Sequence, residues 1–158
     1  MAISLKQETL DGLPNLRKSK YMVASEASEK YNCASLVAGT KKLIWWPNEH
    51  GYWPIGCKRT EEVESFVAAF RRDLGFDRCD DGDFEPGVAK IAIFAENDEV
   101  LHVAIQPTDR NGLWLSKLGD EYDILHALNA LEGGDYGDVV CFLSRRSKNR
   151  PKGKRARQ

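Results

Sequence analysis

Two side chains in this sequence could form a nucleophile and base pair, Cys33 and His102. Asn32 is a favourable N-cap and Gly39 a favourable C′ residue, so residues 33–38 are predicted to form a short helix with Cys33 at its first position. A thiol there faces the positive end of the helix dipole, which favours the thiolate and lowers the thiol pKa. Cys33 is therefore a candidate nucleophile; the alternative is one more buried structural thiol.

His102 lies in an otherwise apolar segment, residues 100–106, that is predicted to be a strand. On its own it is most simply a core or edge histidine that has found a hydrogen-bonding partner. A cysteine at a helix start followed later by a strand histidine is, however, the chain order of papain-like enzymes. Further residues are candidates to orient the imidazole or to assist an oxyanion site: Ser116 or Asp123 for the first role, and Asn32 or Gln106 for the second.

Residues 43–54 hold three of the four tryptophans, interrupted by prolines and a glycine. Neither a helix nor a regular strand fits this pattern, so an ordered loop packed on its aromatic rings is predicted. The loop is either a satellite core or an aromatic wall that shapes a substrate cleft. On the second interpretation, the lining residues are Trp45, Trp46, Trp53, Trp114 and Lys117.

The elements that must position these residues are predicted from hydrophobic periodicity. A helix over residues 60–75 has Thr60 as its N-cap, and a second helix is expected over residues 123–131. Strands are expected at 90–95, 100–106, 113–116 and 139–143, with short turns between the first three. The pattern predicts an α+β domain in which the helix bearing Cys33 packs on an antiparallel meander.

Length and composition favour one domain, residues 1–144, that needs no metal, disulfide or cofactor. Four cysteines are spread along 158 residues without any Cys-x-x-Cys pair. There is no signal peptide and no apolar run long enough to cross a membrane. We expect a cytoplasmic protein, or one exported without a signal peptide, that does not act at a membrane.

The charge is unevenly distributed. Residues 145–158 contain eight basic residues and no acidic one, which leaves 15 Lys and Arg against 24 Asp and Glu in the rest of the chain. This tail is predicted to be disordered. It is a solvated arm, a contact for nucleic acid, or a contact for the acidic body of the domain.

A series of motifs along residues 13–145 resembles an uncharacterised family of small bacterial proteins. The matching motifs are Tyr-Asn-Cys-Ala (31–34), Trp-Trp-Pro (45–47), Tyr-Trp-Pro (52–54), Leu-Gly-Phe-x-x-Cys (74–79), Lys-Ile-Ala-Ile-Phe-Ala (90–95), His-Val-Ala-x-Gln (102–106), Gly-x-Trp-x-Ser-Lys-Leu-Gly (112–119), Asp-Ile-x-His (123–126) and Tyr-Gly (136–137). More distantly, the arrangement is similar to the NlpC and CHAP branches of papain-like amidases. That resemblance implies a papain-like fold and a Cys33 and His102 pair.

Two functions of different classes follow. The first is a papain-like cysteine hydrolase or acyl transferase, acting on an amide, peptide or thioester bond. Cys33 would attack, His102 would carry the proton, and Ser116 or Asp123 would hold the imidazole. The second is a non-catalytic binding domain, in which the aromatic loop and the basic tail contact a protein or nucleic-acid partner.

Overall fold

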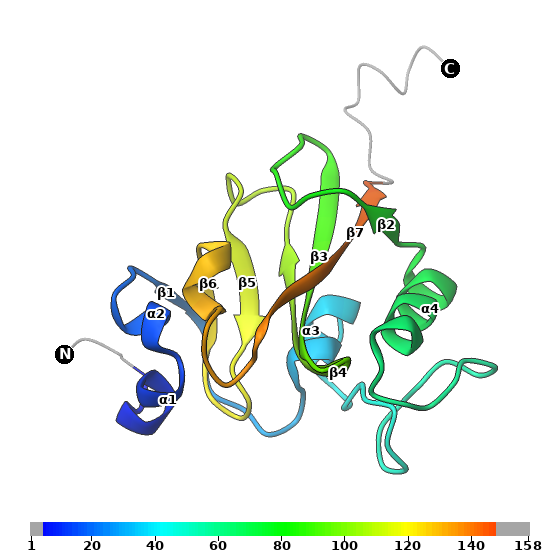
Figure 1. The fold of residues 1–158 in the computed structure, drawn as a ribbon, viewed down its shortest axis with the longest axis horizontal. Helices are drawn as coiled ribbons and strands as arrows, with labels where there is room; N and C mark the ends of the chain where they lie inside the picture. Colours follow the sequence, from blue (N-terminus) through cyan, green and yellow to red (C-terminus); the bar gives the residue numbers. More distant parts are fainter. Residues whose placement is uncertain (1–4, 148–158) are drawn as a thin grey trace.

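The computed structural model describes residues 5–147 and is built on one antiparallel sheet of seven strands. The strand order is β1-β6-β5-β4-β3-β7-β2 (Figure 1). The strands are β1 (Met22–Ser25), β2 (Asp77–Cys79), β3 (Val88–Glu96), β4 (Glu99–Gln106), β5 (Trp114–Lys117), β6 (Asp123–His126) and β7 (Asp138–Arg146).

Short helices cover both faces of this sheet. They are α1 (Gln7–Gly12), α2 (Pro14–Arg17), α3 (Cys33–Ala38), α4 (Val63–Leu74) and the 3-10 helix η1 (Leu128–Leu131). Side chains of α3 and α4 join one hydrophobic cluster, which we call the α3/α4 core. Side chains of α1, α2 and η1 pack into a second cluster, the α1/α2 core.

The interior strand β3 shows why the sheet carries two cores. All of its residues except the last are buried. Ile91 and Ile93 point into the α3/α4 core, whereas Ala92 and Phe94 point into the α1/α2 core. A strand covered on both faces reads as a continuous apolar run, which is the pattern of residues 90–95.

The predicted papain-like fold is wrong. Strands β3 to β6 are successive antiparallel neighbours, as a meander requires. They form only the middle of a larger sheet, because β7 and β2 extend it beyond β3, and β1 extends it beyond β6. The molecule is thus mainly an antiparallel sheet with a few short helices, instead of a Cys-bearing helix packed on a meander.

Local signals at helix ends were predictive in part. Residues 33–38 form α3 as expected, and Gly39 ends it with a φ of 86°. Helix α4 ends at Gly75 as expected, but Glu62 occupies its N-cap position, so the prediction of Thr60 is wrong. Thr60 instead bonds to the side chains of Ser65 and Glu62.

The helix predicted over residues 123–131 is wrong. Its first residues form β6, which pairs with β1 on one side and β5 on the other, and only its last part is helical, as η1. Ile124, Leu125, Leu128 and Leu131 do have helical spacing. Pairing with two strands that are distant in sequence overrides this local preference.

The last strand extends into the segment predicted to be a tail. Arg145 and Arg146 belong to β7, and the Arg145 guanidinium lies 4.4 Å from the Phe76 ring centroid and donates to the Leu74 carbonyl at 2.7 Å. The remainder of the predicted tail, residues 148–158, lies outside the described residues. Within residues 5–147, no helix has the length and apolar character required to span a membrane.

Candidate functional site

Helix α3 presents Cys33 at its first turn and is fixed there by a capping box. The Asn32 side chain accepts the backbone N–H of Ser35 at 3.0 Å, and the Ser35 hydroxyl accepts the backbone N–H of Asn32 at 3.2 Å. Asn32 also donates to the Trp45 carbonyl at 2.8 Å, which ties α3 to the aromatic loop. Its Oδ1 and one of its two amide N–H groups are therefore committed to structure, and the predicted oxyanion role stays a prediction.

The environment of Cys33 does not favour a thiolate. The residue is only 9% exposed, and burial raises the thiol pKa to about 11, although backbone N–H groups of Val103 and of the helix start act in the opposite direction. Desolvation thus outweighs the helix terminus. The prediction of a lowered thiol pKa is wrong, and Cys33 is protonated at neutral pH.

His102 lies on the opposite face of β4 from Cys33. Its ring contacts Phe94 and stacks on Tyr136 with a centroid separation of 4.1 Å, and both aromatic residues pack in the α1/α2 core. The next residue, Val103, points into the α3/α4 core with Cys33. Because successive strand residues point to opposite faces, the sheet separates the two predicted partners.

His102 instead takes part in a buried chain of hydrogen bonds through Ser116 to His126. The Ser116 hydroxyl lies 3.0 Å from Nε2 of His102 and 2.7 Å from Nε2 of His126. Nδ1 of His126 lies 2.7 Å from the Ala127 carbonyl, which fixes that nitrogen as a donor. Nε2 of His126 then accepts from Ser116, and Ser116 accepts from His102.

Burial depresses the pKa of both histidines. Desolvation lowers the pKa of His102 to about 3, with a smaller contribution from His126, and lowers the pKa of His126 to about 4. Both rings are therefore neutral at pH 7, as the hydrogen-bond chain requires. Ser116 contacts His102 directly, and the same hydroxyl also bonds to a second histidine, His126, which was not among the predicted site residues. His126 is the last residue of the motif Asp-Ile-x-His (123–126), but the predicted helix over residues 123–131 gave no reason to place it beside His102.

The other predicted orienting residue, Asp123, lies on the Cys33 side of the sheet. Its carboxylate accepts the Tyr31 hydroxyl at 2.8 Å and also accepts Ser25, and Lys41 lies 3.8 Å away. Lys117, directly opposite Asp123 on β5, is fully buried and donates to three carbonyl groups, those of Ser28, Gly119 and Glu121. These polar groups are satisfied by one another and by the backbone, so they lock residues 25–31 to the sheet.

Gln106 and Trp114 also lie away from Cys33. Gln106 donates to the carbonyls of Gly82 and Gly112, and its Oε1 is buried without a partner. Trp114 is 2% exposed and belongs to the α1/α2 core. Neither of these two residues belongs to the core that contains Cys33, so they do not form the predicted cleft with it.

The aromatic loop packs mainly as core. Trp45 and Trp53 are 4% and 2% exposed, and their rings contact Phe70 and Phe66 of α4 at centroid distances of 5.9 Å and 4.9 Å. Trp46 is partly exposed and donates from Nε1 to Glu61 at 2.7 Å. The loop is thus a rigid aromatic layer held between α3 and α4.

A hollow of about 240 Å³ opens at the edge of this layer. Trp45 lies in its lining, with Leu43 and Tyr52, which are 40% and 42% exposed. The remaining lining residues are Ala38, Thr40, Asp73 and Leu74. Aliphatic and aromatic walls with a few polar groups at the margin are typical of sites that accept an apolar group.

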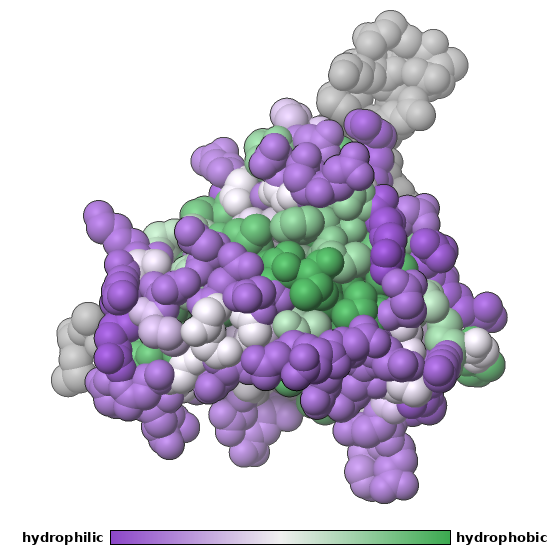
Figure 2. All heavy atoms as spheres, in the orientation of Figure 1, coloured by the Kyte–Doolittle hydropathy of each residue, from purple (hydrophilic) through white to green (hydrophobic). Residues whose placement is uncertain are grey.

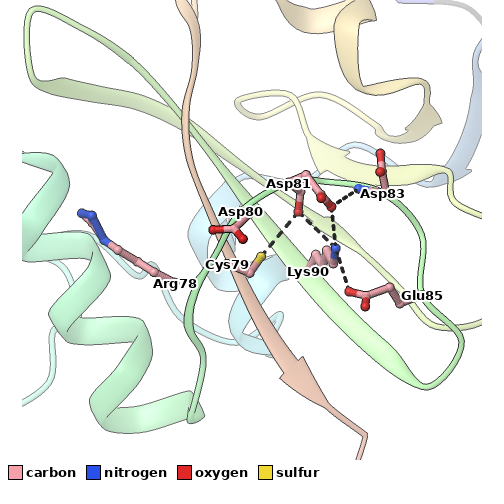
Figure 3. A pocket seen from close by; sticks show the side chains of 7 residues that line it. All are labelled: Arg78, Cys79, Asp80, Asp81, Asp83, Glu85 and Lys90. Atoms are coloured by element: carbon pink, nitrogen blue, oxygen red, sulfur yellow. Dashed lines mark hydrogen bonds and ion pairs between the residues drawn. The ribbon is translucent and has the colours of Figure 1, made fainter.

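A larger hollow of about 450 Å³, lined by Arg78, Cys79, Asp80, Asp81, Asp83, Glu85 and Lys90, is shown in Figure 3. The Lys90 ammonium group donates to the Asp81 carbonyl and lies 3.1 Å from the Asp81 carboxylate and 2.9 Å from that of Glu85. Burial favours the neutral amine, but these two carboxylates outweigh it and raise the Lys90 pKa. Lys90 is saturated by these contacts, so it clamps its loop to the sheet. In the part of the chain that the structure describes, no three His, Cys, Asp or Glu side chains could hold a metal ion.

The comparisons with known proteins give one match. Residues 22–144 match a family described as a domain of unknown function, DUF7689. The chain belongs to the DUF7689 family. No curated protein and no solved structure matches it, so nothing supports the distant resemblance to NlpC and CHAP amidases. The DUF7689 match begins at β1 and ends within β7, so it contains six strands in full and most of β7, but not α1 and α2.

Proposed function

We propose that this DUF7689 domain is a non-catalytic binding domain that accepts an apolar side chain of a protein partner in the hollow beside its aromatic loop. The observation that carries the proposal is that the hollow has a buried, tightly packed aromatic floor, Trp45, and an exposed apolar rim. Trp45 is held by ring contacts to Phe70 and Trp53 below the hollow. Leu43 and Tyr52 remain exposed at its edge.

This arrangement has the features of an energetically important contact site. Binding hot spots are rigid, concave and rich in aromatic residues, because a preorganised pocket loses little conformational entropy when it is filled. The Asp73 carboxylate, which accepts the Tyr52 hydroxyl, adds a negative polar group at the rim. A partner segment with an aliphatic or aromatic side chain next to a hydrogen-bond donor is the best match.

The hydrolase hypothesis has less support. A cysteine hydrolase needs a thiol that is readily ionised and an imidazole within hydrogen-bonding reach of it. Here burial raises the pKa of Cys33 to about 11, and His102 contacts the core on the other face of the sheet. A binding domain needs neither condition.

Selection from a displayed library of random peptides, followed by calorimetry with the selected peptides, tests the proposal. Leu43→Ser should weaken binding by about 10-fold or more, since it removes an apolar wall of the hollow. Two matched controls are Ile55→Ser and Val140→Ser. Ile55 is 88% exposed and Val140 is 55% exposed, and neither lines the hollow.

The two controls distinguish the hollow from other apolar surfaces. Figure 2 shows hydrophobic side chains gathered over the middle of the face on which β7, the strand of Val140, is drawn in Figure 1. Loss of binding in Val140→Ser with retention in Leu43→Ser would place the contact around Val140 and refute the proposed site. Failure to select any peptide would count against the binding function itself.

A further inference from the structure

The two edges of the sheet are built differently. At one edge, β2 has only three residues, and its Asp77 and Arg78 form ion pairs with Arg71 and Glu64. Short, charged edge strands are a common protection against pairing with another chain. At the other edge, β1 has the sequence Met-Val-Ala-Ser, without charge or proline. β1 is also short, and its pairing with β6 shifts register between Val23 and Ser25, but no charged residue within the strand protects this edge.

The outer side of β1 is open in the described structure. β6 pairs with its inner side, in the register Met22↔Leu125 and Val23↔Ile124. No other described strand pairs with β1, which ends the strand order (Figure 1). Met22 is 57% exposed although it lies in a strand. Unpaired backbone groups beside exposed apolar side chains are a template for another strand.

The residues that flank β1 indicate which strand fits. Lys20 precedes it and Glu26 follows it; both are exposed, and neither forms an ion pair within the described residues. If a second β1 is placed antiparallel with Val23 opposite Val23, then Lys20 of each copy faces Glu26 of the other. Opposite charges at facing positions stabilise a strand pair, and like charges destabilise it. A parallel copy would place like charges side by side.

We propose that two copies of this chain pair edge to edge through β1, antiparallel and about a two-fold axis at Val23. The pairing joins the two sheets into one continuous sheet and covers the exposed Met22 of each copy with Ala24 of the other. The contact is isologous, so it closes at the dimer and does not continue into a fibre. Since it involves little more than one short strand from each copy, its affinity is expected to be micromolar or weaker.

Sedimentation equilibrium of the full chain, from micromolar to millimolar concentrations, tests this pairing. The wild type should show a monomer–dimer equilibrium. Lys20→Glu alone places two acidic residues together at both ends of the strand pair, and Glu26→Lys alone places two basic residues together. Each variant should weaken the dimer by about 10-fold or more.

An equal mixture of the two variants is the decisive sample. In a mixed dimer, a Lys20→Glu chain pairs with a Glu26→Lys chain. Each acidic residue of the first chain then faces a basic residue of the second at both ends of the strand pair, so dimerisation should return to the wild-type level. Lys42→Glu is the matched control, because Lys42 is exposed and lies outside β1 and its flanks, and it should leave the dimer unchanged.

Three results would overturn the proposal. One is a wild type that stays monomeric up to millimolar concentration. In that case an extended segment of another protein, and not a second copy, would be the candidate to pair with β1. Another is a dimer that neither Lys20→Glu nor Glu26→Lys weakens. The third is a mixture of the two variants that stays as monomeric as each variant alone. Circular dichroism of each variant at the same concentrations shows that a lost dimer does not reflect a lost fold.

Discussion

At the scale of single residues, burial decides the chemistry of Cys33. The helix start supplies N–H groups that favour a thiolate, yet the sulfur is enclosed in the α3/α4 core, and this raises its pKa to about 11. At pH 7 the thiolate fraction is then about 10⁻⁴. The position in the helix was predictable from Asn32 and Gly39, whereas the enclosure depends on distant elements.

We expect Cys33 to be the slow thiol in an alkylation experiment. With iodoacetamide at pH 7, Cys57 and Cys79, which are both partly exposed, should be modified well before Cys33 and Cys141, which are buried. Peptide mass spectrometry over a time course measures the order directly. Rapid modification of Cys33 ahead of Cys57 would contradict this expectation and restore the nucleophile hypothesis.

The paired histidines predict a loss of stability in mild acid. His102 and His126 have folded pKa values of about 3 and about 4, below the ordinary value of 6.5. Between those limits the unfolded chain binds protons that the folded chain does not bind, so stability falls as the pH drops below 6.5. At pH 5 the expected cost is of the order of 2 kcal/mol per histidine.

Urea unfolding at pH 7 and pH 5 measures this loss, and His126→Gln provides the comparison. Glutamine retains an amide that can bond to Ser116 but cannot take up a proton. The variant should lose less stability than the wild type between the two pH values, whatever its stability at pH 7. An equal loss in both proteins would assign the acid sensitivity to other groups.

At the scale of elements, the aromatic loop stabilises the α3/α4 core unevenly. Trp53 is 2% exposed and packs on Phe66, so Trp53→Ala should destabilise the protein by about 3–5 kcal/mol. Trp46 is partly exposed, and its ring is held by an edge contact to Phe66 and a hydrogen bond to Glu61. Trp46→Ala should lower the free energy of unfolding by clearly less than Trp53→Ala does.

Chemical denaturation of the two tryptophan variants gives both values. If Trp46→Ala cost as much as Trp53→Ala, the outer part of the loop would be as tightly packed as its centre.

Elements were predictable where the signal was local. Residues 33–38 carry their own cap and stop residues, and the hairpin of β3 and β4 is closed by a turn at Asn97 and Asp98, both with positive φ. β6 was not predictable in this way, because its strand geometry depends on pairing with β1 and β5. The sequence shows that His102 and Val103 point to opposite faces of β4. It does not show which of these faces α3 covers.

At the scale of the whole molecule, stability should depend on where the chain is cut near its C-terminus. Residues 148–158 contain no large apolar side chain, so we expect burial to contribute little to ordering them. Truncation after Ser147 should therefore leave the melting temperature nearly unchanged. Truncation after Ser144 removes Arg145, which bonds to Leu74 and lies over Phe76, and should lower it.

Differential scanning calorimetry of the two truncated chains and the full chain makes the comparison. A clear fall in melting temperature for the longer truncated chain would indicate that the basic tail docks on the acidic body. The basic composition of residues 145–158 is read directly from the sequence, and the disorder predicted for them stays a prediction. The predicted boundary is too early, because Arg145 and Arg146 read as tail residues and are strand residues.

The position of β1 has a consequence for synthesis of the protein. This strand leaves the ribosome before its partner β6, which follows about 100 residues later. At ordinary elongation rates that interval lasts roughly 5–20 s. Helices α1 and α2 also reach their packing partners late, because Gly12 and Asn15 contact the segment from Asn129 to Asp135. A nascent chain therefore carries an apolar, unpaired strand for seconds, and anything that shields this segment on the ribosome would raise the yield of folded protein.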